Sequence, residues 1–314
     1  MVMTPTRTAT VVICAHTEER WGDVVAAMAS VRAQERPADQ LVLVIDHNPA
    51  LFDRAVAEFT GPATVVVANE GTRGESGARN AGVAVATGAV LAFLDDDATA
   101  EPAWLGALLD WYEDPEVLGV GGAADPNWDT ERPRWFPTEF DWVVGCSYRG
   151  LPTTADTIRN LMGCNMSFRR DVIEQAGGFY DGLGRTGNDG FGCSETEFCI
   201  RARRLLGGRF VFEPGARIHH RVPRGRTTWR YFAARCRAEG RSKAHLADRE
   251  GQGEALELEK AYVRRTLPTG VARGLRDVTR RDSAGLARSL AIVAGAGWTA
   301  TGYLAGSARR ARTG

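Results

Sequence analysis

The sequence lacks a net charge, because its 39 lysines and arginines balance 39 aspartates and glutamates. A balanced chain has no global positive field to attract nucleic acid, so we expect no nucleic-acid partner. The arginines are unevenly distributed, however, and crowd the segment from Arg201 to Arg249. Its basic stretch 224–249 suits an anionic lipid surface better than a nucleic acid.

Cysteine motifs are also missing. The six cysteines contain no C-x-x-C pair and no zinc-ligand spacing, so neither a redox motif nor a zinc site is predicted. The apolar stretch at 9–15 is short for a signal peptide and is followed by His16 and Glu18. We therefore expect reduced thiols, mostly buried as small hydrophobic groups, in a cytoplasmic protein.

Two phosphate-binding signatures are absent after the first predicted strand. No G-x-G-x-x-G follows it, which argues against a dinucleotide-dependent oxidoreductase. A nucleotidyltransferase would ordinarily have a Gly-rich, basic phosphate loop there, and CAHTEER (14–20) is not one. A metal-dependent nucleotidyltransferase is therefore disfavoured, although it stays the main alternative.

What the sequence does contain is a regular alternation of apolar runs and helical patterns. The alternation predicts right-handed βαβ units and an α/β fold, with a mainly parallel sheet flanked by helices. Residues 125–195 are rich in Trp, Gly, Pro and Asn, and are expected to form loops and short strands over one edge of the sheet. The expected strands are 8–16, 40–46, 63–69, 89–95, 117–124 and a short one at 209–213; the expected helices are 21–34, 51–59, 76–88, 101–114 and 194–205.

Polar residues stand at the carboxyl ends of three expected strands, namely Asp46, Asn69 and the run Asp95–Asp97. Sheets of this kind bind ligands beyond those ends. The adjacent carboxylates repel one another, and Mg²⁺ or Mn²⁺, which take oxygen ligands, would relieve the repulsion. The simpler alternative is that Asp97 or Thr99 caps the following helix.

The run NEGTRGESGARNAGVAVATGAVLAFLDDDA (69–98) resembles the nucleotide-sugar signature of the family 2 glycosyltransferases. Their pattern is roughly N-x-G, A-R-N-x-G, A-x-G and F-x-D-D-D, and VVICAHTEER and LVLVIDHN are similar to the family's first two strand ends. The resemblance covers about 9–232. It implies a GT-A type domain over 1–245, with a nucleotide-binding half (1–124) and an acceptor or catalytic half (125–245), and a helical C-terminal extension over 246–314.

The resemblance assigns residues to the nucleotide. Asp46 would accept hydrogen bonds from a uracil ring, Ala15 would lie beside the base, and Arg79 would help to place the nucleotide. The family usually has a second acidic residue after the Asp46 position, where this chain has His47. The alternative for Arg79 is a surface helix arginine.

The resemblance also assigns a metal and diphosphate site. Asp97 would hold Mg²⁺ or Mn²⁺, Asp95 would bind the nucleotide-sugar, and Asp96 stays undecided between those roles. Alignment through EPGARIHHRV (213–222) places His220 at a metal or diphosphate position, with a structural buried histidine as the alternative. Arg226 is the preferred guanidinium for the diphosphate leaving group, and a solvated basic loop is its alternative.

A second acidic motif, CSETEFCIRARR (193–204), resembles the family's E-D-x-D-L-x-x-R. By that resemblance Glu195 is the general base for an acceptor hydroxyl, while Glu197 and Asn165 are acceptor-side candidates. The alternative is an exposed helix start, where acidic residues are favoured by the helix dipole.

A narrower resemblance concerns the second half of the chain. GCNMSFRRDVIEQAGGFYDGLGRTG (163–187) and RYFAARCRAEGRSKA (230–244) are similar to the family members that add a hexuronic acid to dolichyl- or polyprenyl-phosphate-linked glucose. This implies an inverting transfer from a UDP-sugar to a glycan or lipid-linked acceptor. A non-catalytic sugar-binding module would not need both a metal cluster and a base.

The segment SLAIVAGAGWTATGYLAGSA (289–308) has no charged residue between Arg288 and Arg309. About 20 residues of helix reach roughly 30 Å, the thickness of a bilayer core. Three interpretations stay open: a helix packed within the protein, an interfacial helix, and a membrane span. Gly302 and Gly306 have the G-x-x-x-G spacing that allows close helix contact. Either of the last two would place the enzyme on the inner face of the cell membrane.

Overall fold

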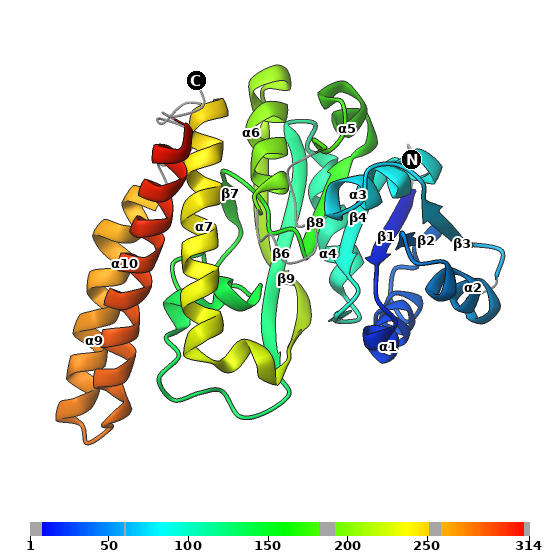
Figure 1. Cartoon of the computed structure of the whole chain (residues 1–314). Helices are drawn as coiled ribbons and strands as arrows, with labels where there is room; N and C mark the ends of the chain where they lie inside the picture. Colours follow the sequence, from blue (N-terminus) through cyan, green and yellow to red (C-terminus); the bar gives the residue numbers. More distant parts are fainter. Residues whose placement is uncertain (1–7, 60, 182–191, 251–258, 311–314) are drawn as a thin grey trace. The chain divides into compact units, whose positions relative to one another are not determined.

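The computed structural model describes residues 8–59, 61–181, 192–250 and 259–310 (Figure 1). The described residues of 1–125, 152–187 and 194–220 form one compact unit, and those of 126–151, 188–193 and 221–314 form a second. The expected catalytic region, 1–245, therefore has residues in both units. The expected C-terminal extension falls within the second.

The strands pair in the order β3-β2-β1-β4-β8-β6-β9-β5, and β7 pairs with β9. β1, β2, β3 and β4 are parallel, as predicted, and the remaining pairs given by their registers are antiparallel. The α/β prediction is thus confirmed, with a mixed rather than a mainly parallel sheet. The strands are β1 (Ala9–Ala15), β2 (Gln40–Asp46), β3 (Thr64–Asn69), β4 (Val90–Asp95), β5 (Ala98–Ala100), β6 (Val117–Trp128), β7 (Asp156–Ile158), β8 (Asn165–Arg169) and β9 (Arg209–Val222).

Two expectations about the later strands were wrong. The segment 125–195 does not lie only over one edge, because β8 is inserted between β4 and β6 inside the sheet. The short strand expected at 209–213 continues as β9 through Pro214 to Val222. Pro214 suggested a turn because proline has no N–H to donate, yet a strand tolerates it where no ladder bond is required.

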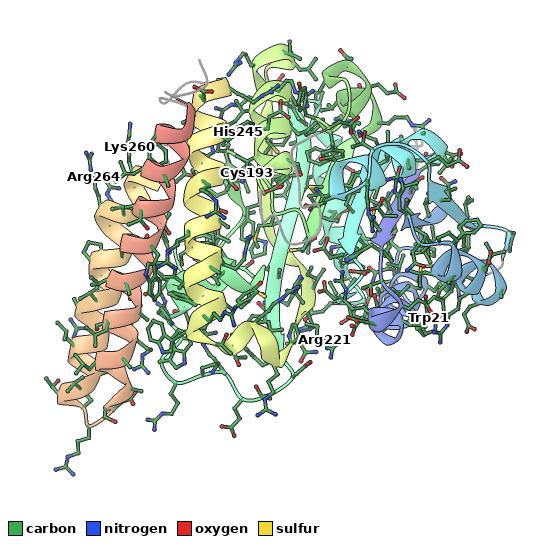
Figure 2. The ribbon with its side chains drawn as sticks, viewed as in Figure 1. Trp21, Cys193, Arg221, His245, Lys260 and Arg264 are labelled. Atoms are coloured by element: carbon green, nitrogen blue, oxygen red, sulfur yellow. The ribbon has the colours of Figure 1, made fainter. Side chains whose placement is uncertain are left out.

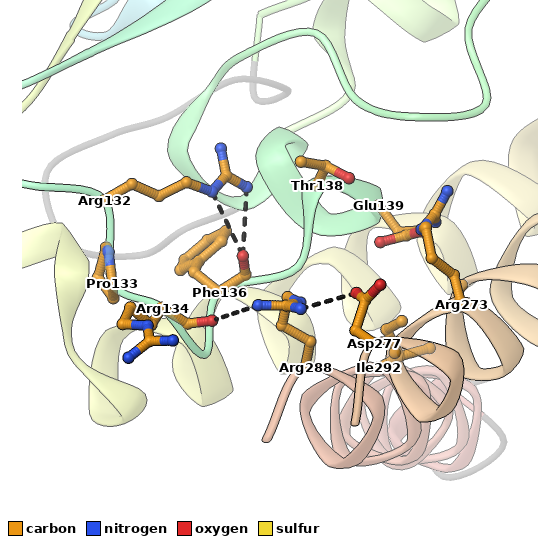
Figure 3. Close-up of a pocket in the computed structure, with 12 residues that line it drawn as sticks. Arg132, Pro133, Arg134, Phe136, Thr138, Glu139, Arg273, Asp277, Arg288 and Ile292 are labelled. Carbon is orange, nitrogen blue, oxygen red and sulfur yellow. Dashed lines mark hydrogen bonds and ion pairs between the residues drawn. The ribbon is translucent and has the colours of Figure 1, made fainter. Parts of the chain in front are cut away.

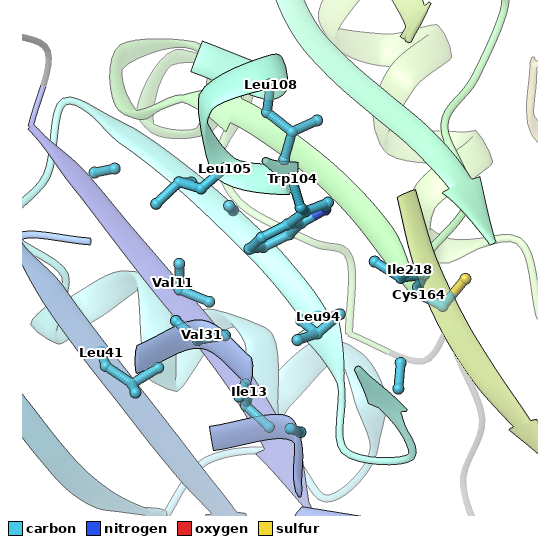
Figure 4. Packing of buried hydrophobic residues seen from close by; sticks show 14 of the residues in the cluster. Val11, Ile13, Val31, Leu41, Leu94, Trp104, Leu105, Leu108, Cys164 and Ile218 are labelled. Atoms are coloured by element: carbon cyan, nitrogen blue, oxygen red, sulfur yellow. The ribbon is translucent and has the colours of Figure 1, made fainter. Parts of the chain in front are cut away.

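Helices cover both faces of the sheet in the first unit. Successive strand residues alternate between faces, so Val11 and Ile13 pack with Trp104 and Leu105 on one side (Figure 4). Val12 packs on the other side with the helices α3, α5 and α6. These helices are α1 (Trp21–Arg32), α2 (Pro49–Glu58) and α4 (Trp104–Asp110) on the first face, and α3 (Glu75–Val85), α5 (Arg170–Ala176) and α6 (Ser194–Leu206) on the second.

A glycine explains how closely α3 approaches the sheet. A Cβ on Gly82 would lie 2.5 Å from Val12 Cγ1 and 3.2 Å from Val44 Cγ2. Only hydrogen fits there, which accounts for the glycine in the run ARNAG. The close contact brings the start of α3 to the carboxyl ends of β1 and β2.

The second unit has its own aromatic core, formed by the 3₁₀ segment η3 (Thr138–Val144) and three long helices. Phe136, Phe140 and Phe232 are buried at its centre, with Leu267 and Ile292 packed around them. The helices are α7 (Trp229–Glu250), α9 (Leu267–Thr279) and α10 (Ala284–Arg310), which run side by side (Figure 1). Most aromatic residues of the 128–148 segment thus serve core packing.

The membrane-span interpretation of 289–308 was wrong for the described chain. Over the described residues, no helix combines the length and the apolar character that crossing a membrane requires. Instead α10 packs on α7 and α9. A Cβ on Gly302 would lie 2.1 Å from the Arg237 carbonyl oxygen, so the G-x-x-x-G spacing serves contact with α7.

Candidate active site

Strand pairing brings the aspartate run to a histidine that is distant in sequence. β4 ends at Asp95, the chain turns through Asp96 and Asp97, and the short β5 then pairs antiparallel with β9. In that register Ala98 lies opposite His220. The side chains of Asp95, Asp97 and His220 consequently meet at the end of the sheet.

These three side chains offer ligand atoms that all lie within 4.8 Å of one another. His220 Nε2 is 3.2 Å from Asp97 Oδ1 and 3.7 Å from Asp95 Oδ2. Two carboxylates and one imidazole suit Mn²⁺ and are compatible with Mg²⁺. Asp96 Oδ2 and His220 Nδ1 are buried and have no hydrogen-bond partner within the described parts of the chain. The residues present therefore fit a divalent cation.

Arg20 is a site residue that the sequence did not single out. It follows β1 in the 3₁₀ turn η1 (Glu18–Arg20), and its Nη1 lies 2.8 Å from Asp96 Oδ1 and 3.0 Å from Asp97 Oδ2. Its Nη2 also contacts His16 Nδ1 at 3.1 Å. The pKa of Arg20 is raised: burial works against its charge, and the carboxylates of Asp96, Asp97 and Asp95 outweigh burial. Arg20 thus supplies a positive charge that partly balances the aspartate run.

Burial dominates the electrostatics of Asp96. It raises the pKa of this carboxyl above its ordinary value; Arg20 opposes the shift, and the carboxylates of Asp97 and Asp95 add to it. Burial and then Arg20 lower the pKa of His16. Since Arg20 donates to His16 Nδ1, the proton of the neutral ring is on Nε2.

Asp46 is held at the end of β2 by three groups. Its Oδ1 accepts from Asn69 Nδ2 at 2.7 Å and lies 2.8 Å from His47 Nδ1, while its Oδ2 accepts from the Gly74 N–H at 2.9 Å. His47, which replaces the family's second acidic residue, has a left-handed φ of 51° and supports Asp46. Ala15 is buried at the end of the adjacent β1. The predicted base-binding residues therefore share one end of the sheet.

Arg79 is not the surface arginine of the alternative interpretation, since it is 3% exposed. It pairs with Glu75 at 2.5 Å and donates to Ser194 Oγ at 3.2 Å and to the Gly163 carbonyl at 3.1 Å. Its pKa is raised: burial opposes the charge, and the carboxylates of Glu75, Asp95 and Glu195 outweigh it. Arg79 thus links α3 to the first residue of α6.

The two glutamates of SETE have different environments. Glu197 is 1% exposed and forms a bidentate pair with Arg201 at 2.7 and 3.0 Å. Glu195 is partly exposed, and its contacts from the Ser194 and Thr196 hydroxyls are long, at 3.5 and 3.4 Å. Glu195 is therefore the more accessible carboxylate, and Glu197 anchors the helix.

The other predicted residues lie as follows. Asn165 is fully buried: its amide donates to the Ala123 and Ala216 carbonyls and accepts from Trp104 Nε1. This gives it a place in the framework of the sheet, and its acceptor contact stays a prediction. Arg226 belongs to the second unit, in the 3₁₀ turn η4 (Arg224–Thr227), where Nη1 contacts the Val144 carbonyl at 3.5 Å.

A cavity of about 410 Å³ lies in the second unit and is lined by residues of the segment 132–136, η3, α9 and α10 (Figure 3). Its arginines are engaged: Arg288 contacts Asp277 at 2.7 Å, and Arg273 pairs with the buried Glu139. Arg132 pairs with Asp141 at 2.6 Å. These ion pairs satisfy the guanidinium groups within the protein. We therefore regard the cavity as a structural contact between the helices and not as a ligand site.

Comparison with known proteins identifies relatives that match part of this chain. The model of the family described as "Glycosyl transferase family 2" matches residues 10–177. A glucosyl-dolichyl phosphate glucuronosyltransferase of Haloferax volcanii is 38% identical over 74% of this chain and 75% of its own. The succinoglycan biosynthesis protein ExoM of Rhizobium meliloti is 27% identical over 77% of this chain and 75% of its own.

Solved structures support the fold. A mannosyltransferase from Pyrobaculum calidifontis, in complex with GDP-Man and Mn²⁺, matches with a TM-score of 0.58 at 18% identity, over 93% of this chain and 87% of its own. GalNAc-T7 with UDP, GalNAc and Mn²⁺ matches with a TM-score of 0.53 at 18% identity. That match covers 74% of this chain but only 47% of the GalNAc-T7 chain.

Proposed function

Since this chain belongs to glycosyltransferase family 2, we propose that it transfers a sugar from a UDP-sugar to an acceptor hydroxyl with inversion of configuration. The observation that carries the proposal is the convergence of Asp95, Asp97 and His220 at one end of the sheet. Arg79 connects that end to α6, which carries Glu195. A nucleotidyltransferase has no corresponding need for a base on a separate helix.

The donor is proposed to lie across the ends of β1, β2 and β4. Asp46, already oriented by Asn69 and Gly74, would accept from the uracil ring, with Ala15 beside it. Asp95, Asp97 and His220 would hold Mg²⁺ or Mn²⁺, which when bound balances the charge of the diphosphate leaving group. The diphosphate role of Arg226, which belongs to the second unit, stays a prediction.

Glu195 is proposed to act as the general base. Its carboxylate would take the proton of the acceptor hydroxyl while that oxygen bonds to the anomeric carbon and the bond from this carbon to the UDP oxygen breaks. A single displacement from the face opposite UDP inverts the anomeric configuration. The partial exposure of Glu195 leaves it accessible to an acceptor, unlike Glu197.

The acceptor is proposed to be a glycan or a polyprenyl-phosphate-linked saccharide, and the transferred sugar a hexose or hexuronic acid. The name of the Haloferax volcanii relative, a glucosyl-dolichyl phosphate glucuronosyltransferase, supports this class. Such an acceptor is embedded in a bilayer. We therefore propose that the enzyme works at the cytoplasmic face of the membrane and contacts it through its C-terminal region.

The test is a screen of UDP-, GDP- and TDP-sugars for nucleotide release with polyprenyl-phosphate-glucose as acceptor, followed by NMR of the product anomer. We expect Mn²⁺- or Mg²⁺-dependent release of UDP and an inverted linkage. Release of pyrophosphate from a sugar phosphate and a nucleoside triphosphate would instead support the nucleotidyltransferase alternative.

Glu195→Gln tests the base. We expect kcat to fall about 100- to 10,000-fold, the usual contribution of a positioned base, while calorimetry shows unchanged UDP binding. The matched control is Glu58→Gln, which removes an exposed carboxylate at the end of α2 and should leave turnover intact. Retained turnover in Glu195→Gln would move the base to another residue.

A further inference from the structure

The second unit exposes four large apolar side chains on α10. Leu286, Leu290, Val293 and Leu304 are 49%, 59%, 60% and 67% exposed. Their spacing of three to four residues, or multiples of it, places them on one face of the helix. The exposed positions between Val293 and Leu304 are Gly297, Ala300 and Thr301, and none of them is charged. Soluble surfaces rarely carry such a row without a partner.

The adjacent helix α9 extends this row. Leu275 and Val278 on α9 are 49% and 41% exposed. The two helices touch closely beside them, because a Cβ on Gly285 would lie 2.2 Å from the Gly274 carbonyl oxygen. Leu275 and Leu286 each follow one of these contacting glycines. The apolar residues of both helices therefore form one surface, which we call the hairpin face: Leu275, Val278, Leu286, Leu290, Val293 and Leu304.

The charges around the hairpin face are strongly biased. In 259–308 the only acidic residues are Glu259, Asp277 and Asp282. Each forms an ion pair, Glu259 with Lys243 at 2.8 Å and the two aspartates with Arg288 at 2.7 Å. The exposed cations at the margins and at the turn include Lys260, Arg264, Arg265, Arg276, Arg280 and Arg281.

Figure 2 shows Arg264 and Lys260 projecting away from the helices at one end of the hairpin. Apolar side chains bordered by guanidinium groups are complementary to a bilayer surface, where acyl chains lie below anionic phosphates. A protein partner or a second copy of this chain would have to supply a matching acidic border.

We propose that the hairpin face rests on an anionic lipid surface, with α9 and α10 lying along it rather than crossing it. The biological meaning of this contact rests on the proposed function, because a lipid-linked acceptor is presented at such a surface. Leu290 and Val293 enter the acyl region, and Arg264 and Arg276 bind lipid phosphates. The contact weakens at high salt, since the phosphate attraction is screened.

The test is co-sedimentation of the full chain with vesicles of phosphatidylcholine alone and of an equimolar mixture with phosphatidylglycerol. The unaltered chain binds the mixed vesicles more tightly, and salt weakens that binding. The double variant Leu290→Ser with Val293→Ser loses about tenfold or more in partitioning. The matched control is Val56→Ser, which replaces a 43% exposed valine of α2 in the first unit and should bind as the unaltered chain does.

Equal partitioning of the double variant and the Val56→Ser control would overturn the proposal. So would a dimer that forms without lipid and dissociates in the double variant, because a second copy would then cover the face. Circular dichroism checks that the variants fold. The double variant Arg264→Gln with Arg276→Gln is an independent test, because its vesicle binding should depend less on salt. Vesicle binding without any sugar transfer would disprove the proposed function and leave the hairpin face in place.

Discussion

At the scale of single residues, Asp97 divides its two carboxylate oxygens between different partners. Oδ2 lies 3.0 Å from Arg20 and Oδ1 lies 3.2 Å from His220. Arg20 also lies 2.8 Å from Asp96, so one guanidinium offsets much of the charge of the run. Arg20 and a divalent cation would thus both be neighbours of the buried Asp97 carboxylate, and this has a measurable consequence.

We predict that Arg20→Met lowers the free energy of unfolding by about 2–3 kcal/mol in EDTA, because it removes the guanidinium that pairs with the buried carboxyl groups of Asp96 and Asp97. We further predict that Mn²⁺ restores more stability to this variant than to the unaltered chain, since the cation no longer shares Asp97 with a guanidinium. Thermal unfolding in EDTA and across a Mn²⁺ series measures both effects.

The matched control is Arg209→Met, which breaks the pair with Asp114 at 2.6 Å on a more exposed part of the same unit. It should lower the stability clearly less than Arg20→Met does and leave the Mn²⁺ response unchanged, because the pair is exposed to solvent. An identical Mn²⁺ response in Arg20→Met and the unaltered chain would show that Arg20 and the cation do not compete.

The residues at strand ends were accessible to sequence reasoning, whereas their supports were not. Asp46, Asp95 and Asp97 follow apolar runs directly, so strand periodicity alone locates them. No strand pattern of this kind locates Arg20 or Ser194. Their positions depend on where the turn after β1 and the start of α6 fall in space, and those are set by packing.

At the scale of elements, the glycines of α10 have opposite environments. A Cβ on Gly302 would lie 2.1 Å from the Arg237 carbonyl oxygen on α7, whereas a Cβ on Gly297 meets nothing within 4 Å. Gly302 therefore sets the distance between two helices, and Gly297 only lowers helix propensity. Substitution by alanine should consequently change the stability in opposite directions at the two positions.

We predict that Gly302→Ala destabilises the protein by about 1–3 kcal/mol, because α7 must move to admit the methyl group. Gly297→Ala should stabilise it by about 0.5–1 kcal/mol, through the better helix propensity of alanine. Urea unfolding without lipid, monitored by circular dichroism, compares the two. Equal effects of both substitutions would mean that α10 does not pack on α7 as described.

Helices and strands were predicted well where a local sequence pattern defines them, and poorly where pairing with other strands defines them. β1 to β4 and the helices between them follow from apolar runs and helical periodicity. β8 was missed because NMSFR (165–169) is only five residues long and has just two apolar side chains; it is a strand because β4 and β6 flank it. β9 extends past Pro214 because β5 and β7 pair with it.

At the scale of the whole molecule, the region 1–245, which the sequence suggested as one domain, has residues in both units. The residues proposed for the nucleotide base, the cation and the catalytic base, from Ala15 to His220, belong to the first unit. The aromatic core and the hairpin face belong to the second. The sequence alone suggested a C-terminal extension from 246, because the family resemblance fades there and no local signal shows that α10 completes a core.

We predict that a chain ending at residue 283, which lacks α10, loses the packing of the second unit while the first unit stays folded. Ile292 is 2% exposed within the aromatic core, and a Cβ on Gly295 would lie 2.5 Å from Phe140, so α10 forms one wall of that core. Its removal uncovers Phe140, Phe232 and Leu267. Hydrogen exchange should show fast amides in α7 and α9 with protected amides in β1, β2 and β4.

Hydrogen exchange of the truncated chain also shows whether α10 is part of the fold or an appendage to it. If the truncated chain kept slow exchange in α7 and α9, α10 would be an appendage whose sole role is outside the fold. Fast exchange means instead that one helix has two faces with separate tasks: its inner face, with Ile292 and Gly295, completes a core, and its outer face, with Leu290 and Val293, is available to a partner. In that case loss of lipid binding on truncation is uninformative, and only substitutions on the outer face test the surface.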